Sequence, residues 1–280
     1  MDGAYLRYVG WVLSDPTTQV RLEAVKALSG VYAQADYVGS LNHFTERFKP
    51  RLIEMAEGDT ELSVRVAVIQ VLESIDGHSL LEDDERERLC LLVFDEEARV
   101  RKAVSGFVRG VWHDSVEERL AGRKMSGEDK DRVGVKALAA LLVKWGKALD
   151  KVVGQDGEEN GSDDSGEGPS RPSNLREVGA IVGLSKKGRT AHAVEALWDA
   201  VEPVSDWEGL LDLLLLDHSA ARNDDDEGNT ERRTNGDEHA ELLAVDEAWR
   251  LGEVEEGVLL EVLVAALSRA KADVGGGKKV

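Results

Sequence analysis

Three similar stretches of the chain decide its fold: "DPTTQVRLEAVKAL" (residues 15–28), "DTELSVRVAVIQVL" (59–72) and "DEEARVRKAVSGFV" (95–108). In each stretch an Asp is followed five residues later by Val and then directly by Arg, and apolar residues continue at helical spacing. The stretches begin 44 and 36 residues apart. Repetition on this scale is typical of a helical solenoid, in which each unit buries its apolar face against the next.

The Asp and the Arg of each stretch predict contacts between repeats. The Asp lies at the start of a predicted helix, where its carboxylate can accept backbone amide hydrogens and is favoured by the helix dipole. The Arg side chain is long enough to touch the Asp of a neighbouring repeat. We therefore expect a structural ladder along one layer of helices, formed by Asp15, Arg21, Asp59, Arg65, Asp95 and Arg101.

A second helix is expected before each of these stretches. The segments are "AYLRYVGWVLS", "SLNHFTERFKPRLIEMAE" and "LEDDERERLCLLVF", and the middle one should kink or break at Pro50. A further pair is expected from "VEERLAG" and "DRVGVKALAALLVKWGKAL". The predicted fold class is therefore all-α, a solenoid of HEAT-type helical hairpins over residues 1–152.

The composition changes after residue 152. Gly, Ser and acidic residues dominate 153–174, which we predict to be a disordered acidic linker, and a similar disordered acidic insert is predicted at 218–240. Between them, 175–217 is predicted to form a helical hairpin whose two helices are separated near Pro203. Residues 241–273 are predicted to be a further helical region.

The charge is unevenly distributed along the chain. Its formal net charge is -20; residues 1–152 carry 22 basic and 26 acidic side chains, and 153–280 carry 13 and 29. Contact with a polyanion such as DNA is therefore expected only from the first half. A basic run there is either a solvated face or a phosphate-contacting patch. The candidates for DNA contact are Arg99, Lys102, Arg109, Arg119, Arg123 and Lys124.

Catalytic and metal-binding patterns are missing from the sequence. The six His residues and the single Cys90 form no zinc-ligand or nucleophile motif, and no phosphate-binding glycine loop follows a strand. No apolar run approaches the roughly 20 residues that span a bilayer. We therefore expect an interaction protein, not an enzyme, with no cofactor, no metal and no membrane partner.

Several segments resemble a known family. "YLRYVGWVLSD", "VRLEAVKALSGVY", "FTERFKPRLIEMA", "VRVAVIQVL" and "LVFDEEARVRKAV" resemble the stromalin conservative domain of the cohesin accessory HEAT-repeat subunit, the stromal antigen family, from about residue 4 to 112. "VEALWDAVEPVSDWEGLLDLLLLDHS" and "EEGVLLEVLVAALSRA" are similar to the following region of the fungal members. Family members are longer, so the resemblance implies an internal fragment or a truncated gene model.

The resemblance implies a nuclear, chromatin-associated scaffold of the cohesin complex, active in sister chromatid cohesion. Its implied partners are the kleisin subunit, short aromatic-x-Phe peptides of cohesin regulators, and DNA, bound weakly through the first half. The matching positions of the peptide pocket are Tyr5, Arg7, Trp11, Arg47 and Phe48. Arg7 stands where animal members have Lys, which keeps the charge but changes the geometry.

Alternative interpretations remain for the site and for the whole chain. Trp11 and Phe48 can be core residues instead of pocket walls, because both belong to amphipathic helices. The chain as a whole can be a generic HEAT adaptor unrelated to chromatin. The blocks "YLRYVGW" and "FTERFKP" favour the cohesin interpretation, since a generic adaptor has no reason to carry both.

Overall fold

The computed structural model describes residues 3–158, 188–218 and 246–276, and every regular element in these ranges is a helix. The predicted all-α fold class is confirmed. The chain divides into two compact units, residues 1–108 with 148–196 and residues 109–147 with 197–280. The division falls inside three helices, and each unit is described below by itself.

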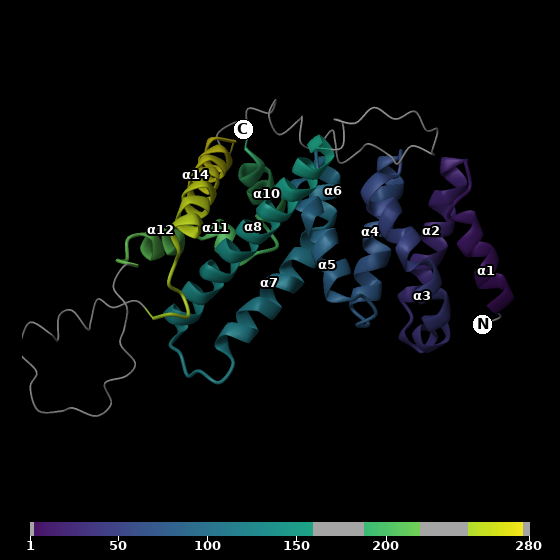
Figure 1. The fold of residues 1–280 in the computed structure, drawn as a ribbon, viewed down its shortest axis with the longest axis horizontal. Coiled ribbons are helices and arrows are strands. Elements are labelled where there is room, and N and C mark those ends of the chain that lie inside the picture. The colour runs from purple at the N-terminus through teal and green to yellow at the C-terminus, as the bar shows by residue number, and fades with distance from the viewer. Residues whose placement is uncertain (1–2, 159–187, 219–245, 277–280) are drawn as a thin grey trace, which may run out of the picture. The chain divides into compact units, whose positions relative to one another are not determined.

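The first unit contains the three repeats. Their helices follow one another in chain order (Figure 1), and the helices of neighbouring repeats pack against each other, α2 on α4 and α4 on α6. The elements are α1 (Gly3–Val12), α2 (Thr18–Tyr32), α3 (Ala35–Gly58), α4 (Leu62–Asp76), α5 (Asp83–Cys90), the 3-10 helix η1 (Leu91–Phe94), α6 (Ala98–Ala103) and most of α10 (Arg189–Leu197).

The repeated Asp shapes the turn before each of these helices. Thr17, Glu61 and Glu97 are the N-cap residues of α2, α4 and α6. The backbone N–H of each donates to the Asp carboxylate two residues earlier, over 2.7, 3.0 and 2.9 Å. The sequence predicted that these carboxylates would accept hydrogen bonds from backbone amides in the first turn of each helix. They bond instead to the N-cap amide, and so they stabilise the turn that enters the helix.

Two of the three repeat arginines reach the next repeat. Arg21 donates from Nε and Nη2 to the two carboxylate oxygens of Asp59, over 2.8 and 2.7 Å. Arg65 donates from Nη1 and Nη2 to Asp95, over 3.3 and 2.5 Å. Hydrogen bonding to Asp59 raises the pKa of Arg21 above its ordinary value. Because each Arg lies in the first turns of its helix, these pairs bring the N-terminal ends of α2, α4 and α6 together in one layer.

Arg101, the last of the three, is anchored within its own repeat. Its Nη1 donates to the backbone oxygens of Asp95 and Glu96, over 2.8 and 2.6 Å. Arg21 uses its Nη1 in the same way, on the backbone oxygens of Asp15 and Pro16. These bonds satisfy carbonyls in the turn before the helix, so Arg21 stabilises its own repeat as well as the contact with the next one, whereas Arg101 stabilises its own repeat.

Of the kink or break predicted at Pro50, the break does not occur. α3 continues through Pro50 from Ala35 to Gly58. Proline removes the hydrogen bond to the carbonyl four residues earlier, that of Glu46. Glu46 and Pro50 are both exposed, so water can bond to that carbonyl, while Leu52 and Ile53 in the next turn are buried. Burial of this turn keeps the helix continuous.

Two predicted boundaries differ from the structure. "VEERLAG" is the end of α7 (Ser105–Leu120), not a separate helix, and α7 stops just before Gly122, whose φ of 76° suits a helix terminus. α8 extends over Gly127–Glu158, so residues 153–158 belong to a helix and not to the predicted linker. The remainder of that linker, residues 175–187 and the insert from 219 to 240 lie outside the described residues.

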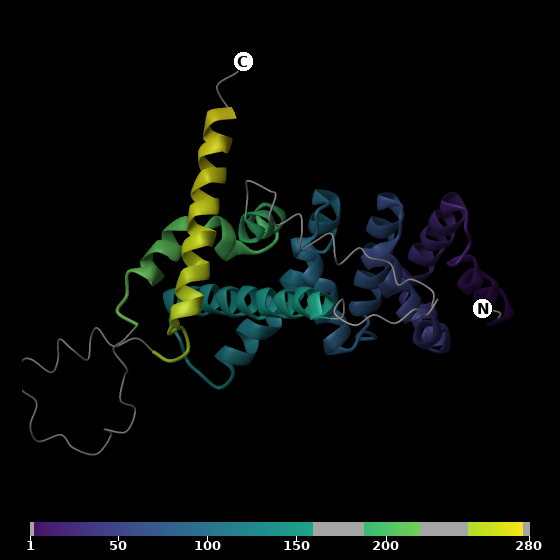
Figure 2. The same ribbon diagram turned by 45° about the horizontal axis from the view of Figure 1, so that its top comes forward.

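The second unit contains α11 (Glu202–Ser205), α12 (Trp207–Leu214), α14 (Glu253–Gly276) and most of α7 and α8. The predicted separation of two helices near Pro203 is found between α10 and α12, and Pro203 itself lies in the first turn of the short helix α11 between them. α12 packs against α14, as both ribbon views show (Figures 1 and 2). Asp206 is the N-cap residue of α12, and its carboxylate accepts a hydrogen bond from the Gly209 N–H, over 3.1 Å.

A buried histidine holds α12 to the segment before α14. Nε2 of His218 lies 2.8 Å from the Leu213 carbonyl, and Nδ1 lies 3.2 Å from the backbone N of Leu251. A carbonyl can only accept and an N–H can only donate, so Nε2 carries the proton and Nδ1 accepts. Arg250 also donates from Nε to the His218 carbonyl, over 2.9 Å. The bonds of His218 with Arg250 and Leu251 join residues that are 32 and 33 positions apart in the chain.

Candidate peptide-binding surface

The first helix presents an aromatic and basic face to solvent. Leu6 of α1 and Leu13, directly after the helix, are buried, while Arg7 and Trp11, one turn apart, are exposed. Trp11 retains 53% of its accessible surface, as a pocket wall would and a core residue would not. The rings of Tyr8 and Trp11 pack edge to face, with centroids 5.3 Å apart and planes at 85°.

Phe48 of α3 lies against the backbone of α1 at Gly10. A Cβ atom at Gly10 would lie 2.1 Å from Cζ of Phe48, so only glycine allows this approach. The Phe48 ring also packs on Phe44, with centroids 4.8 Å apart. The Arg47 guanidinium carbon lies 5.6 Å from the centre of the Phe48 ring, within cation–π range.

The structure therefore brings the predicted residues onto two adjacent helices. Gly10 directly precedes Trp11, so the Phe48 ring touches the turn of α1 that carries Arg7 and Trp11. Arg47 is exposed but Phe48 is only partly so, because its ring contacts Phe44 and Gly10. Phe48 is thus part of the core as well as a candidate wall. Tyr5 belongs to α1, and its side chain lies outside the described residues.

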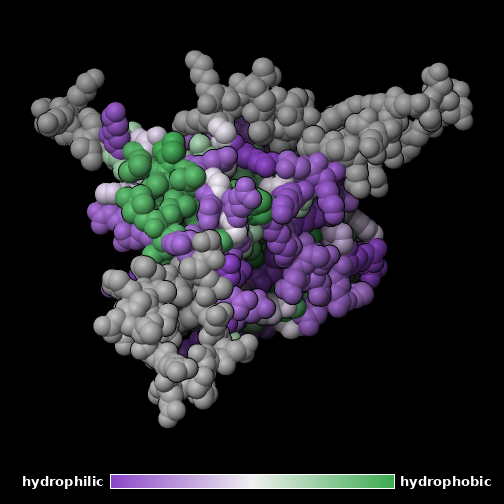
Figure 3. Space-filling view, turned by 60° about the vertical axis from the view of Figure 1, so that its left-hand side comes forward, coloured by the Kyte–Doolittle hydropathy of each residue, from purple (hydrophilic) through white to green (hydrophobic). Residues whose placement is uncertain are grey.

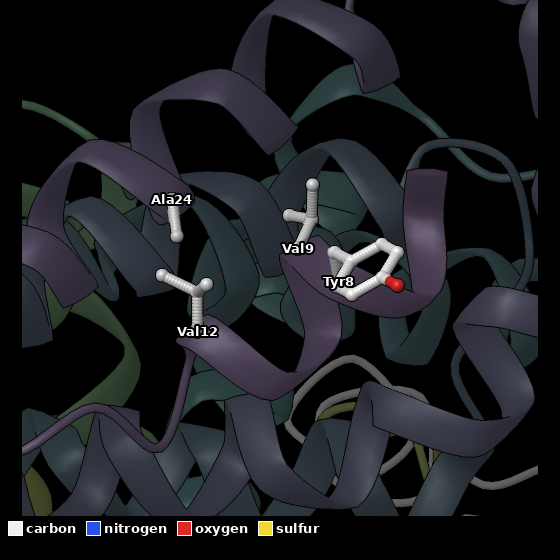
Figure 4. A pocket seen from close by; sticks show the side chains of 4 residues that line it. All are labelled: Tyr8, Val9, Val12 and Ala24. Carbon is white, nitrogen blue, oxygen red and sulfur yellow. The ribbon is translucent and has the colours of Figure 1, made fainter. Parts of the chain in front are cut away.

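A neighbouring apolar pocket was not predicted from the sequence. It has a volume of about 390 Å³ and lies between Tyr8, Val9 and Val12 of α1 and Ala24 of α2 (Figure 4). Tyr8 borders this pocket and also contacts Trp11. The segment "YLRYVGW" could have indicated that Tyr8 belongs to this surface, since Tyr8 lies three residues before Trp11 and so on the same side of the helix.

The six DNA-contact candidates fall into the two units. Arg99 and Lys102 are exposed on α6 in the first unit, and the other four belong to the second. Arg123 pairs with Asp246 over 3.1 Å, which partly neutralises its charge. Arg119 is only partly exposed, while Arg109 and Lys124 are exposed. The six candidates are therefore not shown to form one DNA-binding surface.

The described residues hold no cluster of His, Cys, Asp and Glu side chains suited to a metal ion. Cys90 is fully buried, and burial raises the pKa of its thiol far above the ordinary value. It is therefore a packing residue and not a reactive thiol. Among the described helices, none combines the length and the apolar character required to cross a bilayer.

Comparison with known proteins gives three findings. A model of the stromalin conservative domain matches residues 1–49. Cohesin subunit psc3 of Schizosaccharomyces pombe is 38% identical over 119 residues, which is 42% of this chain and 12% of the relative. Cohesin subunit SA-3 of Homo sapiens is 25% identical over 277 residues, which is 96% of this chain and 17% of the relative. The chain thus spans less than a fifth of the length of either relative.

A solved structure shares the fold. Cohesin subunit Scc3 from Z. rouxii aligns with 94% of this chain and 26% of its own, with a TM-score of 0.58 and 20% sequence identity. The relatives are named as subunits of a complex, not as enzymes, in agreement with the prediction from the sequence. The resemblance noted from "YLRYVGW" and "FTERFKP" is confirmed: residues 1–49 match the stromalin conservative domain, and the chain is similar to cohesin subunits of Schizosaccharomyces pombe and Homo sapiens.

Proposed function

We propose that the chain is a non-enzymatic scaffold of the cohesin complex and acts in sister chromatid cohesion on nuclear chromosomes. The observation that carries this proposal is the match to the stromalin conservative domain at residues 1–49, which includes the exposed Arg7 and Trp11 and also Arg47 and Phe48. The similarity to cohesin subunits over most of the chain supports it. The proposed main partner is the kleisin subunit of cohesin.

We assign to the surface of α1 and α3 the binding of an aromatic-x-Phe peptide. Exposed aromatic rings such as Trp11 offer flat apolar area for the aromatic side chains of the peptide. Arg7 and Arg47 are exposed and can donate hydrogen bonds to peptide carbonyls or to an acidic residue beside the motif. A peptide this short loses entropy on binding, so the expected affinity is micromolar, about -8 kcal/mol.

Calorimetry with a kleisin-bound sample and an aromatic-x-Phe peptide tests this assignment. Trp11→Ala should weaken binding by about 2 kcal/mol and leave the melting temperature nearly unchanged, because the side chain is half exposed. Tyr37→Ala is the matched control, since Tyr37 is an exposed aromatic of α3 outside the predicted pocket. Unchanged binding by Trp11→Ala, or unfolding of that variant, would refute the site. Failure to bind kleisin in a pull-down would refute the scaffold role.

DNA binding is proposed as a second, weaker activity of the same scaffold. The exposure of Arg99, Lys102 and Arg109 supports it, and the acidic second half of the chain opposes it. Replacement of these three residues by Ser should weaken duplex binding. It should also reduce the dependence of the affinity on salt, because fewer phosphates are neutralised and fewer counterions are released on binding. An affinity that does not change with salt would exclude these side chains as phosphate contacts.

A further inference from the structure

Helix α14 of the second unit has apolar residues on two faces, and only one face is covered among the described residues. Leu259 and Val262 are buried, and α14 packs against α11 and α12. Leu260, Val264 and Leu267 are 53%, 64% and 43% exposed. Their spacing of four and three residues places them in one line along the helix. We call these three residues the α14 stripe.

The line of the α14 stripe continues to a charged residue at each end. Glu253 precedes Leu260 by seven residues, which is about two helical turns, and Lys271 follows Leu267 by four. Both charged side chains are exposed, and neither forms an ion pair among the residues that the structure describes. The line therefore carries opposite charges at its two ends, with the apolar residues between them.

This line is complementary to its own reverse. Glu253 and Lys271 lie nine residues on either side of position 262, and Leu260 and Val264 lie two residues on either side of it. Two antiparallel copies of α14 that cross at this position would place Glu253 of each copy opposite Lys271 of the other, and Leu260 opposite Val264. A two-fold symmetric interface requires this kind of self-complementarity.

Gly257 gives a second, independent reason to expect a facing helix. It is exposed in the interior of α14, where glycine costs about 1 kcal/mol relative to alanine. A Cβ atom at Gly257 would meet no other atom within 4 Å, so packing among the described residues does not require glycine there. In the antiparallel pair Gly257 of one copy faces Leu267 of the other, and the missing side chain leaves room for the leucine.

Helix α12 carries another exposed apolar line in the same unit. Trp207, Leu211 and Leu215 follow one another at intervals of four residues and are 38%, 37% and 74% exposed. Figure 3 shows hydrophobic side chains gathered in one area on the side of the molecule where α12 and α14 lie in Figure 1. Apolar side chains that are scattered singly need no explanation, but a contiguous group marks an interaction surface.

We propose that the α14 stripe joins two copies of this chain through an antiparallel pair of α14 helices. The apolar residues supply the attraction, and the two Glu253–Lys271 pairs fix the direction, because a parallel pair would place like charges together. A single pair of helices forms a small interface, near or below the roughly 1,200 Å² of stable complexes, so we expect a micromolar dimer. This surface belongs to the second unit, whereas the candidate peptide-binding surface belongs to the first.

Sedimentation equilibrium of the full chain between about 1 and 100 µM measures the dimer. The parent chain should show a reversible monomer–dimer equilibrium. Val264→Glu places a charge in the middle of the stripe and should raise the dissociation constant at least about tenfold. Val254→Glu is the matched control, because Val254 is 56% exposed on another side of α14, and it should change the constant by less than about twofold. Thermal melts of both variants should agree with that of the parent chain, since both residues are exposed.

Charge reversal tests the antiparallel direction. Glu253→Lys alone and Lys271→Glu alone each make both end pairs repulsive, so each should weaken the dimer about tenfold. Glu253→Lys also lowers the net negative charge of the chain, so general repulsion between two acidic copies predicts a stronger dimer instead. In an equimolar mixture of the two variants every end pair joins opposite charges again, and association should return to within about threefold of the parent.

Three outcomes would overturn the proposal. The first is a parent chain that stays monomeric over the whole concentration range, because the stripe would then belong to a contact with a different protein. The second is an equal effect of Val264→Glu and Val254→Glu, because another surface would then hold the dimer. The third is a mixture of the two charge variants that associates no better than either variant alone, because the helices would then not be antiparallel.

Discussion

The two units of this protein are stabilised in different ways. In the first unit the same short pattern recurs, and each copy makes the same kind of contact with the next, as in the Arg21–Asp59 and Arg65–Asp95 pairs. In the second unit each contact occurs once. The Trp112 Nε1–H donates to the Gly134 carbonyl over 2.9 Å, and Lys136 forms an ion pair with Glu255.

This difference determines which contacts can be recognised from the sequence. A repeated contact can be recognised from the sequence because its residues recur at a fixed offset. A contact that occurs once, such as that of His218 with Leu213 and Leu251, leaves no pattern. Substitutions in each unit test whether the repeated contacts of the first and the single contacts of the second stabilise the two units to different extents.

Asp59→Ala should destabilise the first unit most strongly. The Arg21 and Asp59 side chains are 9% and 3% exposed, so the substitution leaves a buried guanidinium without its carboxylate, an expected loss of about 3–5 kcal/mol in the free energy of unfolding. Hydrogen exchange in α2 and α4 under increasing urea measures it. Asp36→Ala, at an exposed Asp in the first turn of α3, is the control and should lose less than about 1 kcal/mol. Equal effects of the two would show that the pair does not stabilise the repeat contact.

His218→Ala should destabilise the second unit by about 2 kcal/mol. The change leaves the Leu251 N–H without its partner in a buried place, and it removes one of the two hydrogen bonds to the Leu213 carbonyl, which also accepts from the Leu216 N–H. Tryptophan fluorescence reports this unit, because five of the six Trp residues, all except Trp11, belong to it. The control is His113→Ala, an exposed His that pairs with Glu117 on the same helix. Unfolding midpoints that are alike for both variants would contradict a stabilising role of His218.

Trp112→Phe should have a smaller effect in the same unit. It keeps most of the ring but removes the N–H that donates to the Gly134 carbonyl, and loss of one such bond is expected to reduce stability by about 1 kcal/mol. Trp207→Phe removes the N–H of a partly exposed Trp and serves as the comparison in urea titrations. A loss as large for Trp207→Phe would show that ring size, and not the hydrogen bond, determines the effect.

Lys26→Ala should have the smallest effect. The Lys26 and Glu23 side chains are 57% and 59% exposed, so water and salt screen their ion pair and the expected change is below about 0.5 kcal/mol. The same urea titration measures it. A change comparable to that of Asp59→Ala would mean that burial does not distinguish the ion pairs of the first unit.

The repeated helices, the offset of the repeat Asp and Arg residues and the all-α class could be predicted from the order of the residues alone. These features depend on local periodicity and on residues that recur at fixed spacing, which can be read without knowledge of distant contacts. The periodicity alone left Trp11 open between core residue and pocket wall, and only the family resemblance favoured the exposed position in which the structure places it.

Other features depend on neighbours that are distant in the chain, and they become visible only in the folded protein. α3 stays helical through Pro50 because its next turn is buried. Phe48 is partly core because Gly10, 38 positions earlier, admits its ring. His218 is a structural residue because Leu213 and Leu251 lie on either side of its ring. In each case the physical cause is packing or hydrogen bonding between segments that are separated in the chain, and the identity of the residues alone does not specify which segments meet.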